Sequence, residues 1–227
     1  MNKGYFRHII TISSILLAFC ACSDDNDFVY PNMITELAEM KTGKDGNIQS
    51  LVVDNGTCYE IQNKDKYDGL IKDSTYRVLA SYVQLDEKNK SLVEIKTIRL
   101  TNSSYPIKRE KVKQIATDPV ELQSIWTSGN YLNVYVISKV KDIQHIYRFI
   151  EDSITTSNGR KTLHISLLHQ RNNDIEGYNR TVYLSVPLYP YHQTFSRTDS
   201  VSFTLNTYKN GFIKRTFPFP IRETLDY

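Results

Sequence analysis

The stretch Ser200-Val201-Ser202-Phe203-Thr204-Leu205-Asn206 alternates strictly between polar and apolar side chains. Successive side chains of a β-strand point to opposite faces of the sheet, so the alternation places the three apolar residues on one face. The stretch therefore predicts a strand with one face against a core and the other face in solvent. The same alternation occurs earlier, at Leu163, Ile165 and Leu167 and at Val182, Leu184 and Val186.

Strands of this kind fill the C-terminal half of the chain. They are separated by turns at Asn158-Gly159, Asn172 to Gly177 and Asn210-Gly211, whose residue types accept the backbone conformations of tight turns. Six or seven antiparallel strands at this spacing are typical of a β-sandwich. We expect the strands at Asn130 to Val140, Gln144 to Ile150, Lys161 to His169, Arg180 to Leu188, Val201 to Tyr208 and Phe212 to Phe217.

A second series of strands precedes the sandwich. Ile48 to Val53 and Cys58 to Ile61 flank Asp54-Asn55-Gly56, a strong hairpin signal because Asn and Gly accept positive φ. Thr75 to Leu85 has apolar side chains at both parities, as in a strand that coils through a small barrel. Within Ser91 to Leu100 the apolar positions change parity, which indicates a bulge or a bend. These features predict a small OB-type barrel.

The fold class expected from both series is all-β, with an OB-type barrel at residues 46–103 and an antiparallel sandwich at residues 119–227. The segment 104–118 is charged and is bounded by prolines, so it predicts a linker between two domains. Ahead of the barrel, we expect residues 22–45 to form a flexible acidic tether. Only Met33 to Met40 has a weakly helical composition.

The N-terminus has the pattern of an export signal. Lys3 and Arg7 supply positive charge ahead of the apolar run Ile9 to Phe19, which is shorter than the roughly 20 residues needed to span a bilayer. The pattern predicts a secretory signal peptide. Cleavage between Ala21 and Cys22 places a small side chain before the cut. It also leaves Cys22 first, which resembles the bacterial lipoprotein signal, in which this thiol is acylated.

We therefore expect residues 1–21 to be removed and Cys22 to carry a membrane-anchoring lipid such as palmitate. Cleavage before Cys20 would place the bulky Phe19 ahead of the cut, so Cys22 is the preferred position. The alternative is an ordinary secreted protein with an accidental cysteine near the cleavage site.

An acidic cluster follows the predicted lipid attachment site. Closely spaced carboxylates repel one another, so one interpretation is a solvated tether. The cluster also resembles the signal that sends Bacteroides-type lipoproteins to the outer face of the outer membrane. The second interpretation predicts an outer-membrane lipid anchor at the cell surface, and otherwise the protein faces the periplasm. The candidate export-signal residues are Ser23, Asp24, Asp25 and Asp27.

Charge and cysteine content restrict the partners. The chain has 28 Lys and Arg against 25 Asp and Glu, and removal of Lys3 and Arg7 leaves a net charge of +1. This balance gives no support for a nucleic-acid partner. After cleavage and lipidation Cys58 is the remaining cysteine, so no internal disulfide can form. Its place in an alternating segment predicts a small buried hydrophobe rather than a nucleophile.

The sequence contains no G-x-S-x-G, H-E-x-x-H, C-x-x-C or phosphate-binding glycine loop. We therefore expect no catalysis, no cofactor and no metal. His164 and His169 are expected to point to opposite faces of one strand, which prevents joint ligation of a metal. Asn172 to Gly177 has oxygen atoms suited to calcium, but the same residue types are ordinary in turns.

The most ligand-like loop is Tyr189-Pro190-Tyr191-His192. Tyr189 and Tyr191 adjoin a proline, and rings held in this way can stack on sugars, although Tyr and Pro are equally ordinary at the edge of a sandwich. Three triplets resemble the O-glycosylation acceptor of Bacteroides-type exported proteins: Asp73-Ser74-Thr75, Asp152-Ser153-Ile154 and Asp199-Ser200-Val201. The candidate acceptors are Ser74, Ser153 and Ser200.

Several stretches resemble the NigD-like lipoproteins of the Bacteroides group. They are Asp118 to Trp126, Gly129 to Asn133 and Leu163 to His169, together with the lipoprotein start. The chain departs from the family pattern at Gln170-Arg171, where an Asp would stand beside the histidine. The resemblance implies an N-terminal OB-type barrel and a C-terminal β-sandwich, and it implies little about activity.

Our functional hypothesis is a lipid-anchored envelope protein that acts by binding a glycan or a protein partner. The alternative is an immunity-type protector against a bacteriocin, because the resembled family is named after a member proposed to act in this way. An enzyme of an unrecognised type is the third possibility. A bacteriocin gene beside this one would favour immunity, whereas glycan-uptake genes would favour binding.

Overall fold

The structure is a computed structural model that describes residues 32–63, 67, 69–85 and 91–221. Residues 32–227 belong to one compact unit. The predicted signal peptide, Cys22 and the acidic cluster lie outside the described residues, so they remain predictions. No helix in the described part of the chain is both long enough and apolar enough to cross a membrane.

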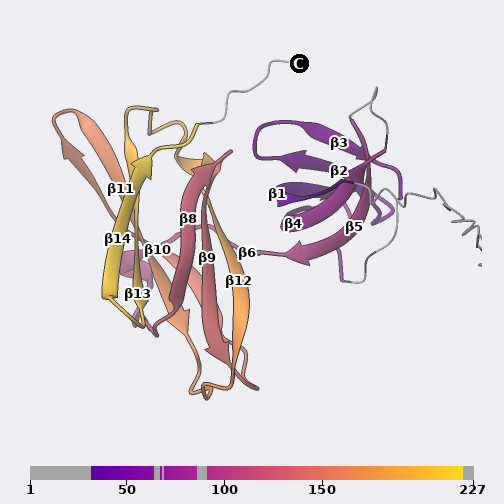
Figure 1. Cartoon of the computed structure of the whole chain (residues 1–227). Helices are drawn as coiled ribbons and strands as arrows, with labels where there is room; N and C mark the ends of the chain where they lie inside the picture. Colours follow the sequence, from indigo (N-terminus) through magenta and orange to yellow (C-terminus); the bar gives the residue numbers. More distant parts are fainter. Residues whose placement is uncertain (1–31, 64–66, 68, 86–90, 222–227) are drawn as a thin grey trace, which may run out of the picture. The chain divides into compact units, whose positions relative to one another are not determined.

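A closed five-stranded barrel forms the first part of the described chain (Figure 1). Its strands are hydrogen-bonded in the order β1-β2-β3-β5-β4, and β4 returns to β1. A small five-stranded barrel of this kind is the OB-type fold, which confirms the predicted fold class. The strands are β1 (Met33–Thr42), β2 (Ile48–Val53), β3 (Cys58–Ile61), β4 (Thr75–Gln84) and β5 (Leu92–Leu100).

The barrel is filled by apolar side chains from all five strands. The register between β4 and β5 shifts beside Tyr82: Ser81 faces Thr97, but Tyr82 faces Ile95. Lys96 is therefore the extra residue of a β-bulge, as the change of parity predicted. The buried core includes Met40, Leu51, Ile61, Val78 and Ile95.

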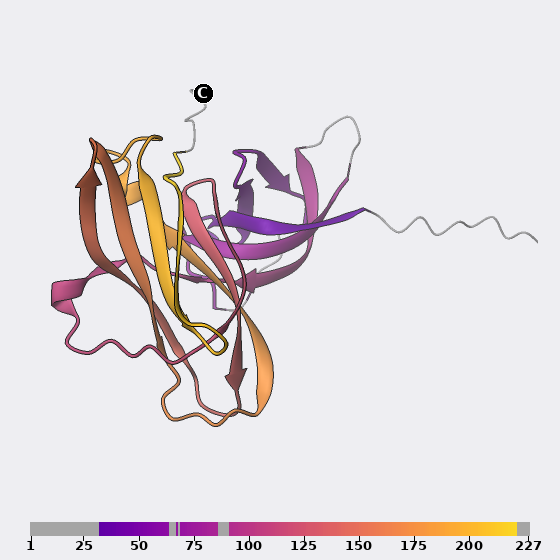
Figure 2. The ribbon, with the colours of Figure 1, turned by 60° about the vertical axis from the view of Figure 1, so that its left-hand side comes forward.

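Two sheets form the sandwich (Figures 1 and 2). One has the strand order β14-β13-β11-β10-β7 and the other has the order β6-β12-β9-β8. The strands are β6 (Asn102–Ser103), β7 (Ile107–Lys108), β8 (Glu121–Ser128), β9 (Tyr131–Val140), β10 (Ile146–Ser157), β11 (Arg160–Gln170), β12 (Tyr178–Pro187), β13 (Ser200–Thr207) and β14 (Gly211–Pro218).

The alternating stretches supply the sandwich core. Val201, Phe203 and Leu205 on β13 are at most 1% exposed, and the corresponding apolar residues of β11 and β12 belong to the same buried cluster. The turn between β10 and β11 has positive φ at Asn158 (51°) and Gly159 (74°), the conformation that Asn-Gly hairpin turns require. Both the strand pattern and the turn chemistry are therefore confirmed.

The sandwich is not purely antiparallel. β13 runs parallel to β11, while the short strands β6 and β7 run parallel to β12 and β10. The chain passes from one sheet to the other between β12 and β13, so β13 does not form a hairpin with the strand that precedes it. β8 was not among the expected strands, because a register shift between Leu122 and Ser124 interrupts its alternation.

The prediction of a flexible tether over residues 22–45 was wrong for its second half. Met33–Thr42 is strand β1, which pairs with both β2 and β4 and closes the barrel. Its Ala, Glu, Leu, Met and Lys content favours a helix only weakly, and propensity gives way to tertiary packing. Ala38 and Met40 are fully buried in the barrel core.

The segment 104–118 is not a simple linker. Asn102–Ser103 and Ile107–Lys108 each add a short strand to one sheet of the sandwich, and Thr117 bridges to His169. A 3₁₀ turn, η1 (Arg109–Lys111), directly follows β7, and Figure 2 shows this magenta segment extending to one side of the sandwich. The sandwich therefore begins directly after β5.

Cys58 is exposed, so the prediction of a small buried hydrophobe was wrong. The alternation of β3 has the opposite phase: Tyr59 and Ile61 are buried, and Cys58 and Glu60 face solvent. The alternation was correctly recognised, but its phase was assigned to the wrong face of the barrel.

Candidate functional site at the barrel–sandwich junction

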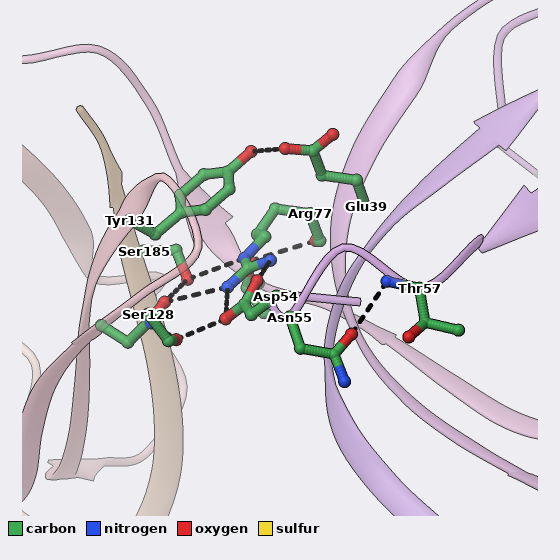
Figure 3. A network of polar contacts seen from close by, with 10 residues as sticks. Glu39, Asp54, Asn55, Thr57, Arg77, Ser128, Tyr131 and Ser185 are labelled. Atoms are coloured by element: carbon green, nitrogen blue, oxygen red, sulfur yellow. Dashed lines mark hydrogen bonds and ion pairs between the residues drawn. The ribbon is translucent and has the colours of Figure 1, made fainter. Parts of the chain in front are cut away.

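A buried arginine lies where the barrel meets the sandwich. The side chain of Arg77, on β4, is 2% exposed. Its guanidinium forms a bidentate ion pair with Asp54, in the β2–β3 turn, with Nη1–Oδ1 and Nη2–Oδ2 distances of 2.6 and 2.8 Å (Figure 3). The planar guanidinium matches the two carboxylate oxygens, so the pair fixes both position and orientation. It ties the β2–β3 turn to β4, a strand that pairs with neither β2 nor β3.

The other donors of Arg77 reach the sandwich. Nη2 donates to Oδ1 of Asn133 at 3.2 Å, and Nε donates to Oγ of Ser185 at 3.4 Å. Asn133 and Ser185 are both fully buried. Asn133 in turn donates to Ser128 at 2.9 Å, and Ser128 donates to Asp54. The hydrogen bonds therefore run from the barrel into the sandwich and back to the carboxylate of the ion pair.

Tyr131 adds a second link between the two parts. The guanidinium carbon of Arg77 lies 3.9 Å from the centre of the Tyr131 ring, which is a cation–π contact. The Tyr131 hydroxyl donates a hydrogen bond to the carboxylate of Glu39, on β1, at 2.9 Å. Burial raises the pKa of Tyr131, and the Glu39 carboxylate raises it further. The phenol therefore keeps its proton and remains a hydrogen-bond donor.

Gly129 allows the β8–β9 turn to approach Asp54. Its φ of +56° lies in the left-handed region, and a Cβ here would lie 3.1 Å from the Asp54 carbonyl oxygen. A side chain would therefore be both strained and crowded. The β8–β9 turn can lie this close to Asp54 because Gly129 has no side chain.

A groove of about 670 Å³ lies beside this network. Its volume is in the range of about 300–1,000 Å³ that is usual for ligand sites. The barrel wall comes from β1, β4 and the β2–β3 turn, and the sandwich wall comes from β8, the turn after it, and β12. The lining residues are Thr35, Glu36, Leu37, Asp54, Asn55, Leu79, Trp126, Ser128, Gly129 and Tyr183.

Each wall of the groove includes apolar side chains. Leu37 and Leu79 face each other across β1 and β4 on the barrel side. Neither belongs to the buried cluster inside the barrel, and both line the groove instead. Trp126 and Tyr183 stand on the sandwich side, and Tyr183 stacks on Tyr135 with ring centres 4.9 Å apart.

Polar groups complete the lining. On the groove face of β1, Oγ1 of Thr35 lies 2.8 Å from Oγ of Ser81, and Asn55 Oδ1 accepts a hydrogen bond from the backbone N–H of Thr57 at 2.8 Å. Glu36 stands on the opposite face of β1 and accepts a hydrogen bond from Tyr82 of the barrel core. The lining contains no Lys or Arg, and the carboxylate of Asp54 is already engaged by Arg77. Apolar walls with a few fixed polar groups suit the binding of a ligand.

The structure separates the two tyrosines of the predicted ligand loop. They lie in the short 3₁₀ helix η2 (Tyr189–Tyr191). Tyr191 packs against the sandwich core, and its hydroxyl donates to Glu151 at 2.6 Å. Tyr189 is 42% exposed, and its ring contacts Tyr105 and Tyr131. The loop therefore does not present both rings on one surface, and neither ring lines the groove.

His164 and His169, the pair considered for metal binding in the sequence, occupy different environments. His164 is half-buried, with ring nitrogens 2.8 Å from Thr155 and 2.6 Å from Ser202. His169 is 2% exposed, with its Nδ1 2.8 Å from the Asp118 carbonyl and its Nε2 2.9 Å from His145. A carbonyl oxygen only accepts, so Nδ1 of His169 carries the proton. Burial lowers the pKa of His169, which favours the neutral ring.

Asp174, in the Asn172 to Gly177 turn, holds two loops together. Its carboxylate accepts backbone N–H groups of Lys141 at 2.6 Å and of Asp142 and Ile175 at 3.1 Å, and it lies 3.4 Å from Nε2 of His145. Burial acts to raise the pKa of Asp174, but the backbone N–H groups outweigh it and lower the pKa to about 2. Its oxygens therefore bind backbone groups.

Within the described ranges, no three His, Cys, Asp or Glu side chains gather in a way that could hold a metal ion. The predicted glycosylation acceptors lie in three settings. Ser74 is half-buried and donates to the Lys72 carbonyl at 3.0 Å, whereas Ser200 is half-buried at the start of β13. Ser153 is exposed at a register shift in β10. Modification of these residues remains a prediction.

Sequence reasoning did not find the junction residues. Arg77 interrupts an apolar strand, and a charged residue in that position is the signal that could have indicated a buried ion pair. Asn133 and Gly129 belong to the stretch that resembles the NigD-like lipoproteins, but the sequence does not show which barrel residues they meet.

The fold and the junction define the class of protein: a two-part all-β protein with an OB-type barrel and a β-sandwich. Residues 103–219 match the model of the NigD-like C-terminal beta sandwich domain. This match covers more than half of the chain, so the chain belongs to the NigD-like family. A comparison with curated protein sequences gave no match.

Solved structures agree with this assignment. A NigD-like immunity protein from Bacteroides caccae is 26% identical, with a TM-score of 0.66, and the similarity covers 83% of this chain and 98% of that chain. A Bacteroides vulgatus protein of unknown function is 17% identical, with a TM-score of 0.64, over 84% of this chain and 92% of that one. The second likeness shows the fold alone.

Replacing Arg77 tests the junction network. Arg77→Met should lower the free energy of unfolding by about 3–5 kcal/mol, because Asp54 is left as an uncompensated charge. Asp54→Asn combined with Arg77→Met should recover part of that loss. Denaturant unfolding of the four proteins of this double-mutant cycle measures the coupling. The control, Lys96→Met, breaks the exposed pair with Glu94 and should cost less than about 1 kcal/mol. Equal losses in Arg77→Met and Lys96→Met would contradict the network.

Asp174→Asn tests the loop clamp through its pH dependence. The carboxylate has a lowered pKa in the folded state, so its contribution is complete above the unfolded pKa of about 3.9 and is lost as the pH falls towards 2. The variant should be less stable than the parent at pH 7, and the difference should shrink between pH 5 and pH 2. Urea unfolding across this range measures it. A difference that stays constant with pH would rule out the clamp.

Proposed function

We propose that this protein is a cell-envelope binding protein whose ligand occupies the groove between the barrel and the sandwich. The observation that carries the proposal is the groove itself, because the buried Arg77 network holds its barrel wall and its sandwich wall in fixed positions. A site built on rigid strands and supported by buried hydrogen bonds is preorganised, which reduces the entropy lost when a ligand binds.

The envelope location is part of the same proposal and rests on the sequence. Acylation of Cys22 after removal of residues 1–21 would tether the chain to a membrane, and the acidic residues that follow would direct it to the cell surface. A surface-displayed binding protein meets its ligand outside the cell. The groove belongs to the folded part that such a tether would present.

An immunity-type role is the second candidate. It is favoured by the likeness to the Bacteroides caccae structure, which is described as a NigD-like immunity protein and is covered over 98% of its length. In that case the ligand would be a bacteriocin, and binding at the envelope would block it before it acts. A bacteriocin gene beside this one would favour the second candidate.

Capture of ligands on intact cells tests the proposed function. The tagged full-length lipoprotein should retain specific molecules, and Tyr183→Ala in the groove should lose them. Phe212→Ala is a matched control, because this aromatic ring is 64% exposed and lies outside the groove lining. Mass spectrometry of both captured sets measures the difference. An identical set with Tyr183→Ala, while that variant keeps the wild-type melting temperature, would refute a groove ligand.

Protease shaving of intact cells tests the location. The wild-type protein should be removed from the surface, and replacement of Ser23, Asp24, Asp25 and Asp27 by Ala should make it protease-resistant. That variant should remain in the membrane fraction, because Cys22 still carries the lipid. Cys22→Ala should leave the membrane fraction altogether. Unchanged shaving of the acidic variant would show that the cluster is only a tether.

A further inference from the structure

We propose that the junction groove binds a neutral oligosaccharide. This inference rests on the proposed binding function and names the chemical class of the ligand. It is carried by three features of the described lining: aromatic and aliphatic walls, a polar rim that offers both a donor and an acceptor, and the absence of a cation.

The walls match the apolar faces of sugar rings. A pyranose ring presents C–H groups on its faces and hydroxyl groups around its edge. Trp126 and Tyr183 stand on one wall, and Leu37 and Leu79 line the other, so the groove offers apolar surface on two sides. Aromatic side chains bury a large apolar area and have few rotatable bonds. They therefore lose little conformational entropy when a sugar ring packs on them.

The rim matches the hydroxyl groups. A sugar hydroxyl both donates and accepts, so it needs partners of both kinds. Thr35 stands on the same face of β1 as Leu37, and its hydroxyl oxygen, 2.8 Å from Oγ of Ser81, keeps a lone pair that can accept from a ligand. Asn55 uses Oδ1 for the backbone of Thr57, and within the described residues its amide nitrogen is a donor with no hydrogen bond. These two side chains come from β1 and from the β2–β3 turn.

The charge of the lining argues against the other ligand classes. An anionic ligand such as a phosphate or a uronate would find no Lys or Arg in the lining. Arg77 lies behind it, with its charge neutralised by Asp54. A basic peptide would find no free carboxylate in the described lining, because Asp54 is paired with Arg77 and Glu36 points into the barrel, where it accepts from Tyr82. Burying a charge without a partner costs several kcal/mol, so a neutral ligand is favoured over either kind of ion.

The sequence supplies a reporter for the test. Trp126 is the single tryptophan of the chain and lines the groove, so intrinsic tryptophan emission reports on this site. The purified full-length protein is titrated with neutral gluco-, manno- and galacto-oligosaccharides of four to eight units. Heparin oligosaccharides and hexalysine are the charged comparisons. We expect a saturable emission shift with at least one neutral oligosaccharide and none with the charged probes.

Variants connect the signal to the lining. Tyr183→Ala and Asn55→Asp should each weaken binding by tenfold or more. Asn55→Asp keeps the oxygen that accepts from Thr57 and replaces the amide donor with a carboxylate oxygen, and because it adds a charge beside Asp54, its melting temperature is compared with that of the wild type. Phe212→Ala should bind like the wild type. No response to any neutral oligosaccharide, saturable binding of hexalysine or heparin alone, or binding unaffected by Asn55→Asp and Tyr183→Ala would each overturn the proposal. Groove-dependent capture on cells without a neutral-sugar response would remove this inference and leave the proposed function standing.

Discussion

The buried ion pair between Arg77 and Asp54 is the constraint on which the junction depends. A guanidinium that is 2% exposed must have its donors satisfied inside the protein, and three of its nitrogens find oxygens of Asp54, Asn133 and Ser185. These partners come from both the barrel and the sandwich. Because the charge cannot be left unpaired, the two parts are held in one arrangement, and the walls of the groove are held with them.

The network differs in kind from the two apolar cores. Each core is formed by residues of its own part of the chain, Ala38 to Ile95 in the barrel and Val120 to Phe219 in the sandwich. Apolar packing is not directional, so it would tolerate several ways of placing one part on the other. Hydrogen bonds from a planar guanidinium are directional, so they select one arrangement of the barrel and the sandwich. The buried polar residues therefore contribute specificity of arrangement more than net stability.

The sequence predicted what depends on local periodicity. Strand alternation around Phe203, the hairpin at Asn55-Gly56 and the bulge beside Lys96 all follow from neighbouring residues. β1 was missed because its composition points weakly to a helix, and only its pairing with β2 and β4 makes it a strand. Arg77, Asn133 and Trp126 were missed as site residues because the site is formed by residues far apart in the sequence. No periodicity records which barrel residue meets which sandwich residue.

The assignment of β1 as a barrel strand also sets a length. If Cys22 carries the lipid, eleven peptide steps separate it from Met33, where the barrel begins. A fully extended chain spans at most about 3.3–3.6 Å per residue, so the barrel starts no more than about 40 Å from the membrane surface. The groove residues Thr35 to Leu37 follow almost at once. Under that condition, a ligand in the groove would be held within roughly one bilayer thickness of the membrane.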